Sequence, residues 1–174
     1  MGMKKHRYQF EPLGEQHFDI LRDWFRSPEV QKWYGDDSNL KTIENHLSDD
    51  RISMMLVRLD GRPLAYLQDY EIFGWEHHHL NFLPAGSRGM DTFIGQQDML
   101  SKGHGENYLR CQINRLFKVG VPAVGIDPHP DNVRAIRAYE KLGFKGDQKR
   151  ETEWGRVLLM SLHRPEYPAP KSHN

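Results

Sequence analysis

Two strand–turn–helix units follow one another in the second half of this 174-residue chain, and they constrain its fold more than any other feature. In the first unit, a strand predicted over 88–95 leads through a glycine-containing turn into a helix over 103–119. In the second, a short apolar strand over 123–126 leads through the turn DPHPDN into a helix over 130–142, which ends at Gly143. The pattern is typical of an α/β sheet covered by helices.

The first half of the chain predicts a small helical segment and a hairpin. Asp60-Gly61 lies between two apolar runs and indicates a tight hairpin turn. Ser27-Pro28 places a capping residue and a proline at the start of a short helix. The remaining predicted elements are a strand over 8–12, helices over 15–26, 28–33 and 40–48, strands over 52–59 and 63–73, a loop over 74–86 and a last strand over 157–162.

The length fits one domain, expected over 1–164, with a Pro-rich polar tail over 165–174. Lys plus Arg and Asp plus Glu both number 24, so no net charge favours nucleic acid or a membrane as a partner. A single cysteine, Cys111, excludes a disulfide within the chain and suits a reducing compartment. The basic start of the chain has no apolar segment typical of a signal peptide, which favours a cytoplasmic location.

The segment LSKGHG, between the strand over 88–95 and its helix, is a candidate anion-binding turn. Gly103 and Gly105 permit backbone angles and a close approach that larger residues obstruct. The N–H groups of His104, Gly105, Glu106 and Asn107 are then expected to point at an anion such as a phosphate. An ordinary glycine-containing loop is the alternative, because the segment matches neither the P-loop nor the dinucleotide-binding fingerprint.

In the strand before this turn, successive side chains are expected to point to opposite faces of the sheet. Met90, Thr92 and Ile94 are predicted to face one side of the sheet, and Asp91 and Phe93 the other. Asp91 is therefore either a carboxylate on a half-exposed strand or a functional group presented beside the anion-binding turn.

Four segments in order, RGMDTFIG, LSKGHG, IDPHPDN and NVRAIRAYEKLGF, resemble the GNAT acetyltransferases, and within them the aminoglycoside 6′-N-acetyltransferase branch. WFRSPEVQKWYG and GRPLAYLQDY give weaker support, and the resemblance covers most of residues 10–162. The family's Q/R-x-x-G-x-G/A motif falls on Leu100 to Gly105, with Leu100 where many members have Gln or Arg.

The resemblance implies a mixed, mostly antiparallel sheet of about six or seven strands flanked by helices in a single domain. It also implies direct transfer of an acetyl group from acetyl-CoA to a primary amine, without a metal. Asp91 is similar to the proposed general base, and Tyr139 to the acid that protonates the departing thiolate. The ordinary pKa of a tyrosine, about 10, suits that exchange with a thiol.

The same resemblance implies residues for the two substrates. The residues expected to bind acetyl-CoA are Phe93, Ile94, Lys102, Gly103, His104, Gly105, Glu106, Asn107 and Asn132. The residues expected to contact the acceptor are Trp33, Tyr34, Asp91 and Asp127. Several of these residues, and Tyr139, also have a purely structural interpretation. The alternatives are core packing for Tyr139, a turn for Asp127, a local helix cap for Asn132 and a hydrophobic anchor for Trp33 and Tyr34.

The run Glu76-His77-His78-His79 invites a metal interpretation, but three consecutive histidines do not converge on one ion without strain. Instead, it dilutes the negative charge that the aminoglycoside branch places in this loop. Three hypotheses follow: an aminoglycoside acetyltransferase, an acetyltransferase for another small amine such as an N-hydroxylysine siderophore precursor, and a non-catalytic CoA-binding module. All three predict a small-molecule acceptor or ligand, with the chain as a monomer or homodimer.

Overall fold

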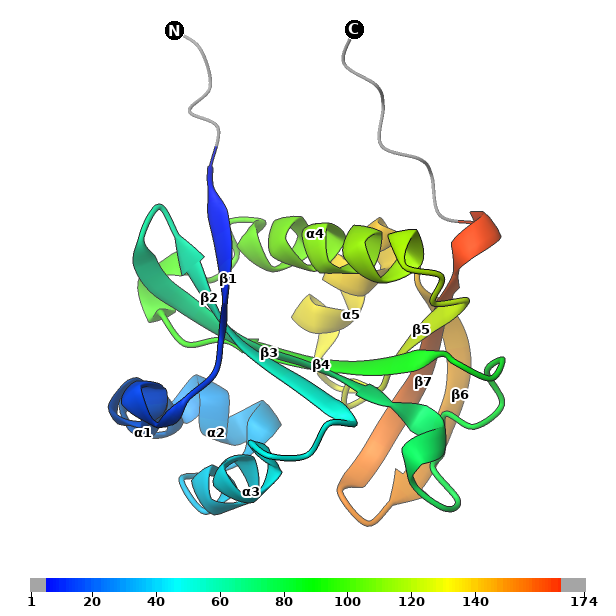
Figure 1. Ribbon diagram of the computed structural model, residues 1–174, viewed down its shortest axis with the longest axis horizontal. Helices are drawn as coiled ribbons and strands as arrows, with labels where there is room; N and C mark the ends of the chain where they lie inside the picture. Colours follow the sequence, from blue (N-terminus) through cyan, green and yellow to red (C-terminus); the bar gives the residue numbers. More distant parts are fainter. Residues whose placement is uncertain (1–5, 167–174) are drawn as a thin grey trace, which may run out of the picture.

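A sheet in the order β1-β2-β3-β4-β5-β7-β6 forms the centre of the computed structural model, which describes residues 6–166 (Figure 1). All neighbouring strands are antiparallel except β4 and β5, which are parallel. The seven strands within the described residues are β1 (Tyr8–Pro12), β2 (Ile52–Leu59), β3 (Arg62–Glu71), β4 (Arg88–Ile94), β5 (Ala123–Ile126), β6 (Lys145–Thr152) and β7 (Gly155–His163). The mixed, mostly antiparallel sheet predicted above is therefore confirmed.

Helices cover both faces of the sheet. On one face lie α1 (Phe18–Phe25), α2 (Pro28–Tyr34) and α3 (Asn39–His46), and on the other lie α4 (His104–Lys118) and α5 (Val133–Leu142) (Figure 1). Short 3-10 turns follow or precede these elements at Glu15–His17, Ile72–Gly74, Gln97–Met99 and Arg164–Glu166. The helices predicted over 15–26, 28–33, 40–48 and 103–119 are found within one to three residues of those bounds.

The two faces of β2 show how the sequence builds both layers. Met54 and Leu56 pack with α1 to α3, whereas Met55 and Val57 pack with α4 on the other face. Each side chain is buried, so the strand reads as a continuous apolar run rather than as an alternating one. The sheet is therefore a shared wall between two hydrophobic clusters.

The loop after β3 covers part of the face on which α1 to α3 lie, where those helices do not reach. Ile72, Leu80 and Leu83 are buried against Ala123 of β5 and Leu159 of β7. This loop therefore seals the half of the sheet that α1 to α3 leave open. It also brings the segment from residue 75 to 83 next to the end of β5.

The parallel pair β4 and β5 separates after two residue pairs. Their register contains Arg88 with Val124 and Gly89 with Gly125, after which β4 continues to Ile94 alone on that side. Gly95 N–H donates to the Leu64 carbonyl across the β3–β4 ladder. Because pairing alternates along an antiparallel ladder and β5 has already separated, the N–H groups of Thr92 and Ile94 point away from β3, into the opening beside β5.

Two predictions of element bounds need correction. The sequence analysis did not predict β6. All but the last of its eight residues are exposed, and all eight are polar or glycine, because an edge strand needs no alternation of apolar residues. α5 begins at Val133 rather than at residue 130, because Asn132 caps it and the preceding residues form a turn. The tail predicted over 165–174 falls mostly on residues 167–174, which lie outside the described part of the chain, so that prediction stays untested.

Candidate active site

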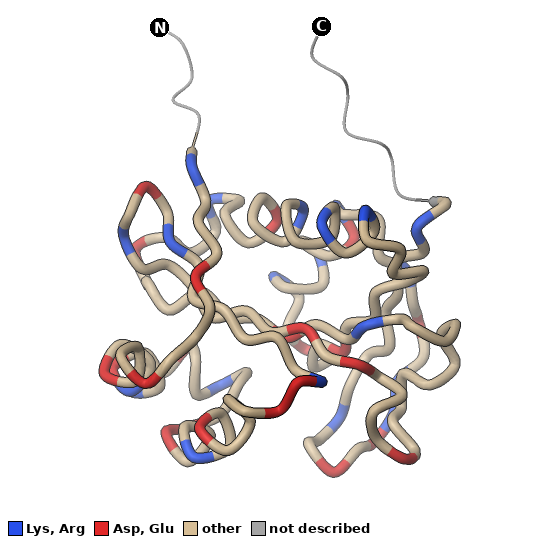
Figure 2. Tube along the Cα trace, in the orientation of Figure 1, with Lys and Arg blue, Asp and Glu red and all other residues tan. Residues whose placement is uncertain are grey.

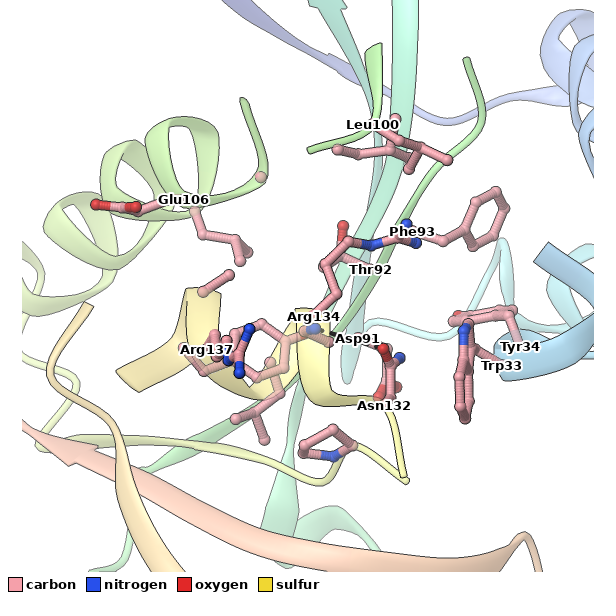
Figure 3. Close-up of a pocket in the computed structure, with 18 of the residues that line it drawn as sticks. Trp33, Tyr34, Asp91, Thr92, Phe93, Leu100, Glu106, Asn132, Arg134 and Arg137 are labelled. Atoms are coloured by element: carbon pink, nitrogen blue, oxygen red, sulfur yellow. Dashed lines mark hydrogen bonds between the residues drawn. The ribbon is translucent and has the colours of Figure 1, made fainter. Parts of the chain in front are cut away.

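A cavity of about 680 Å³ opens where β4 and β5 separate. Its walls are the exposed side of β4, the end of β5, the first turns of α4 and α5, and α2 from the other layer (Figure 3). Two strand–helix units thus place both helix N-termini at one cleft, a position that favours anionic ligands.

The first turn of α4 has the geometry of an anion-binding site. Gly103 is the helix N-cap with φ +81°, a left-handed conformation that strains residues with a side chain. Its carbonyl accepts the N–H of Asn107, at an N···O distance of 3.1 Å. The N–H group of Asn107 is therefore not a free donor, contrary to the prediction. The N–H groups of His104, Gly105 and Glu106 precede that first helical bond and have no carbonyl partner in the helix.

The side chains of this turn leave the amides accessible. The Glu106 carboxylate accepts from Arg110, at 3.1 Å, and points along the helix rather than into the cleft (Figure 3). The His104 ring is buried and its Nδ1 lies 2.7 Å from the Tyr8 hydroxyl. Lys102 and Asn107 do not line the cavity, whereas Gly103, His104, Gly105 and Glu106 do.

Asp91 is held on the floor of the cleft by a hydrogen-bonded chain of side chains. The Gln68 amide donates to Asp91 Oδ2 at 2.7 Å, and the Tyr66 hydroxyl donates to Gln68 Oε1 at 2.6 Å. Tyr34 interacts with Tyr66 at the far end of the chain. Asp91 therefore has a fixed orientation, set from the adjacent strand β3 and from α2.

Burial raises the pKa of Asp91 from 3.8 to about 7. The negative charge of nearby Asp127 adds to the rise, and the hydrogen bond from Gln68 opposes it. A carboxylate with a pKa near 7 is matched to accepting a proton at neutral pH, which an ordinary aspartate is not. Asp127, at the end of β5, in turn contacts His79, with Oδ2 2.5 Å from Nε2.

Tyr139 points into the cleft from α5 and is 7 % exposed. Within residues 6–166, its phenolic oxygen has no hydrogen-bond partner, so its proton is available to a ligand. Burial raises the pKa of Tyr139 well above its ordinary value, so the close match to a thiol that the ordinary value predicted does not hold in the folded protein. Proton donation from this phenol requires that the resulting phenolate be stabilised by what the cleft binds.

The aromatic pair at the end of α2 divides between two environments. Tyr34 packs on Phe93, with ring centroids 4.7 Å apart, as part of the core beneath α1 to α3. Trp33 lies over the cleft, 5.8 Å from the His129 ring, and its indole N–H donates to Glu29 at 3.2 Å (Figure 3). Trp33 is thus the member of the pair that presents a flat face to the opening.

The first turn of α5 supplies groups that the sequence analysis did not select. Arg134 forms an ion pair with Glu29 across the cleft, and Arg137 lies one turn further along the same face. Both line the cavity, and their spacing opposite the apolar stripe of the helix was a signal in the sequence. Asn132 accepts the Ala135 N–H through Oδ1 at 3.3 Å, which is the local capping role, and also lines the cavity.

The cavity gathers most of the residues selected from the sequence. Those that line it are Trp33, Tyr34, Asp91, Phe93, Ile94, Gly103, His104, Gly105, Glu106, Asp127, Asn132 and Tyr139. Gln68 and His79 reach the site only through Asp91 and Asp127, and nothing in their local sequence marks them.

Other site types find no support in the described part of the chain. Across residues 6–166, no three His, Cys, Asp or Glu side chains are arranged to hold a metal ion. No helix in that range is both long and apolar enough to cross a membrane. Lys and Arg positions are interspersed with Asp and Glu positions along the chain trace (Figure 2).

Comparison with known proteins gives this cleft its context. A model of the acetyltransferase (GNAT) domain matches residues 14–152. The chain is 27 % identical to aminoglycoside N(6′)-acetyltransferase type 1 of Klebsiella pneumoniae, over 92 % of this chain and 85 % of that protein.

Solved structures agree with that comparison. The aminoglycoside acetyltransferase AAC(6′)-Ib in complex with coenzyme A and kanamycin superposes with a TM-score of 0.82 at 25 % identity, covering 92 % of this chain and 96 % of that one. Its complex with ribostamycin and coenzyme A gives 0.84 at 25 % identity, covering 96 % and 99 %. The family model matches most of this chain, and the fold is shared with solved members of the family. The chain therefore belongs to the GNAT acetyltransferase family.

Proposed function

We propose that this protein transfers the acetyl group of acetyl-CoA to a primary amine of an aminoglycoside, at the 6′-amino position, as its relatives' names describe for them. The observation that carries the proposal is the meeting of Asp91, Tyr139 and the free amides of α4 at one cleft, in a chain of this family. All these groups come from one chain, so the proposal fits a monomer or a homodimer. We expect the reaction in the cytoplasm, where acetyl-CoA is available.

The first turn of α4 is proposed to bind the diphosphate of acetyl-CoA. The amides of His104, Gly105 and Glu106 are the donors, and the helix dipole adds a favourable partial charge. The pantetheine arm then runs between β4 and α5, past Asn132. The N–H groups of Thr92 and Ile94, left without a β5 partner, are positioned to donate to the thioester carbonyl as negative charge develops on its oxygen.

The acceptor amine reaches the cleft as an ammonium and must lose two protons during the reaction. One proton passes to Asp91, which makes the amine a nucleophile, and then to solvent. The nitrogen attacks the thioester carbon, the C–N bond forms and the C–S bond breaks. Tyr139 donates its phenolic proton to the departing sulfur of CoA. The reacting nitrogen then gives up its second proton, which restores the phenol of Tyr139.

Trp33 and the carboxylates on the floor are proposed to select the acceptor. A sugar ring stacks on the indole face, and the amino groups meet Asp91 and Asp127. This arrangement provides both apolar contact and negative charge for a cationic amino sugar.

The experiment is a thiol-release assay with acetyl-CoA and a panel of amines, with the acetylated position found by NMR. Turnover of kanamycin or tobramycin with acetylation at the 6′-nitrogen supports the proposal. Acetylation of other small amines, with none of any aminoglycoside, refutes the acceptor but keeps the reaction. Binding of CoA without turnover of any amine refutes the enzyme and leaves a binding module.

A second acceptor class is favoured by one observation. Two carboxylates near the cleft already have cationic or histidine partners, Glu29 with Arg134 and Asp127 with His79. Glu106, the third such carboxylate, is held by Arg110. Among the acidic residues that line the cavity, Asp91 is therefore the one without a basic partner. A small acceptor with one amine fits that charge distribution, and the same panel separates it from a polycationic aminoglycoside.

A further inference from the structure

A pair of stacked histidines lies behind the acceptor end of the cleft and has no place in the chemistry described so far. His78 and His79 are 9 % and 7 % exposed, and their ring centroids lie 4.2 Å apart. The outer residue of the run, His77, is exposed and has a positive φ of 59°. Only the inner two are therefore built into the protein.

The loop that carries them is firmly anchored. Leu80 is fully buried in the cluster over β5 and β7, and its N–H donates to His78 Nδ1 at 3.1 Å. The His78 ring also lies 5.4 Å from the Tyr70 ring, and the Trp154 indole covers both histidines. The orientation of His79 is thus set by its neighbours on both sides.

The hydrogen bonds divide the two rings into different states. A backbone N–H only donates, so His78 Nδ1 must be an unprotonated acceptor, and His78 is neutral. Burial lowers the pKa of His78, which agrees with this assignment. His79 Nε2 faces a carboxylate oxygen at 2.5 Å, so the proton shared by these groups lies between His79 and Asp127.

This contact reaches Asp91 through Asp127. The charge of Asp127 raises the pKa of Asp91, and the charge of His79 lowers it. The other ionisable groups that face the two carboxyls are His78 and the phenols of Tyr34, Tyr66, Tyr70 and Tyr139. Burial raises the pKa of each phenol, so the phenols stay neutral, and His79 is the basic side chain in hydrogen-bond contact with Asp127.

We propose that His79 is a positioning residue for acetyl transfer: it orients Asp127 through a hydrogen bond and offsets its charge, so that Asp91 accepts the proton of the acceptor amine. The proposal rests on the proposed function for its effect on rate. Its electrostatic part concerns the protein alone and is measurable without any acceptor.

Two substitutions separate the roles of hydrogen bond and charge. His79→Gln keeps an N–H donor near the Nε2 position but has no titratable group. His79→Phe keeps a ring that stacks on His78 but has no N–H donor and no titratable group. His77→Asn is the matched control, because it is exposed and asparagine tolerates a positive φ. Circular dichroism and urea unfolding establish that each variant is folded.

The first readout is the pH profile of kcat/KM in the thiol-release assay. We expect the acidic limb to move to higher pH by about one unit in both His79 variants, with a lower kcat in His79→Phe that His79→Gln partly restores. The control should match the wild type. A uniform loss of rate at every pH, with the limb unmoved, would assign His79 a purely structural role and overturn the proposal.

The second readout is the titration of the Asp91 carboxyl carbon by ¹³C NMR in the protein without substrates. The midpoint is expected to rise by about one pH unit in His79→Gln. An unchanged midpoint overturns the inference even if the enzyme acetylates aminoglycosides. A shifted midpoint in a protein that acetylates no amine upholds the electrostatic link, and refutes the proposed function alone.

Discussion

Replacement of Asp91 by asparagine tests whether this carboxylate accepts the proton of the acceptor. Asparagine preserves the size of the side chain, and its carbonyl still accepts the hydrogen bond from Gln68. It removes the base and the charge together. We expect kcat/KM to fall by about 10²–10³-fold, in line with the loss of general base catalysis.

The wild-type enzyme gives the matching pH dependence. Because the pKa of Asp91 is raised to about 7, its basic form declines below that pH, and kcat/KM should fall about tenfold per pH unit there. The residual activity of Asp91→Asn should lack this limb. Asp147→Asn, on the exposed strand β6, is the control and should behave as the wild type.

The same substitution has a predicted effect on stability. A carboxyl whose pKa is higher in the folded state than in the unfolded state destabilises the fold as pH rises from about 4 to about 7, and the loss persists above that. A rise from 3.8 to about 7 corresponds to roughly 4 kcal/mol in a closed site. Asp91 is partly open to the cleft and solvent screens its charge, so we expect Asp91→Asn to gain about 1–2 kcal/mol.

Urea unfolding at pH 4.5 and pH 8 measures this difference. The advantage of Asp91→Asn over the wild type should be small at the lower pH and largest at the higher. The reasoning fails if the variant keeps wild-type kcat/KM, or if its stability relative to the wild type is the same at both pH values.

Three further substitutions probe other parts of the site. Tyr139→Phe should lower kcat by about 10²-fold with little change in the Kd of acetyl-CoA, because the lost proton matters only at the departing sulfur. An unchanged kcat, with chemistry shown to be rate-limiting, excludes the acid role. Gly103→Val places a β-branched residue at φ +81°, so we expect about 1–3 kcal/mol of lost stability and weaker CoA binding by calorimetry. Normal CoA binding to the folded variant would contradict the diphosphate assignment. Trp33→Ala should raise the KM for the acceptor about tenfold and leave the Kd of acetyl-CoA unchanged, and a raised Kd instead would place Trp33 at the donor site.

The fold and part of the site followed from patterns that are local in sequence. Alternation along 88–95 placed Asp91 and Phe93 on one face and Met90, Thr92 and Ile94 on the other, and the structure confirms it. The glycine turn before α4 was recognisable because φ +81° at Gly103 demands a glycine.

The parts that were missed depend on contacts between distant segments or on exposed strands. β6 lies at the sheet edge with a polar surface, so nothing in its sequence distinguishes it from a loop. The pairing of His79 with Asp127 joins residues 48 positions apart, and the raised pKa of Asp91 depends on its burial in the folded protein and, in addition, on Asp127 beside it. Propensity and spacing carry no information about such contacts.

A crystal structure of the protein with coenzyme A and kanamycin tests the central claim most directly. The account predicts the diphosphate on the amides of residues 104–106, the sulfur within hydrogen-bond reach, about 3–4 Å, of the Tyr139 oxygen, and an amino group of the sugar equally close to Asp91. Coenzyme A bound away from the gap between β4 and β5, or a sugar whose amines all lie far from Asp91, would contradict it.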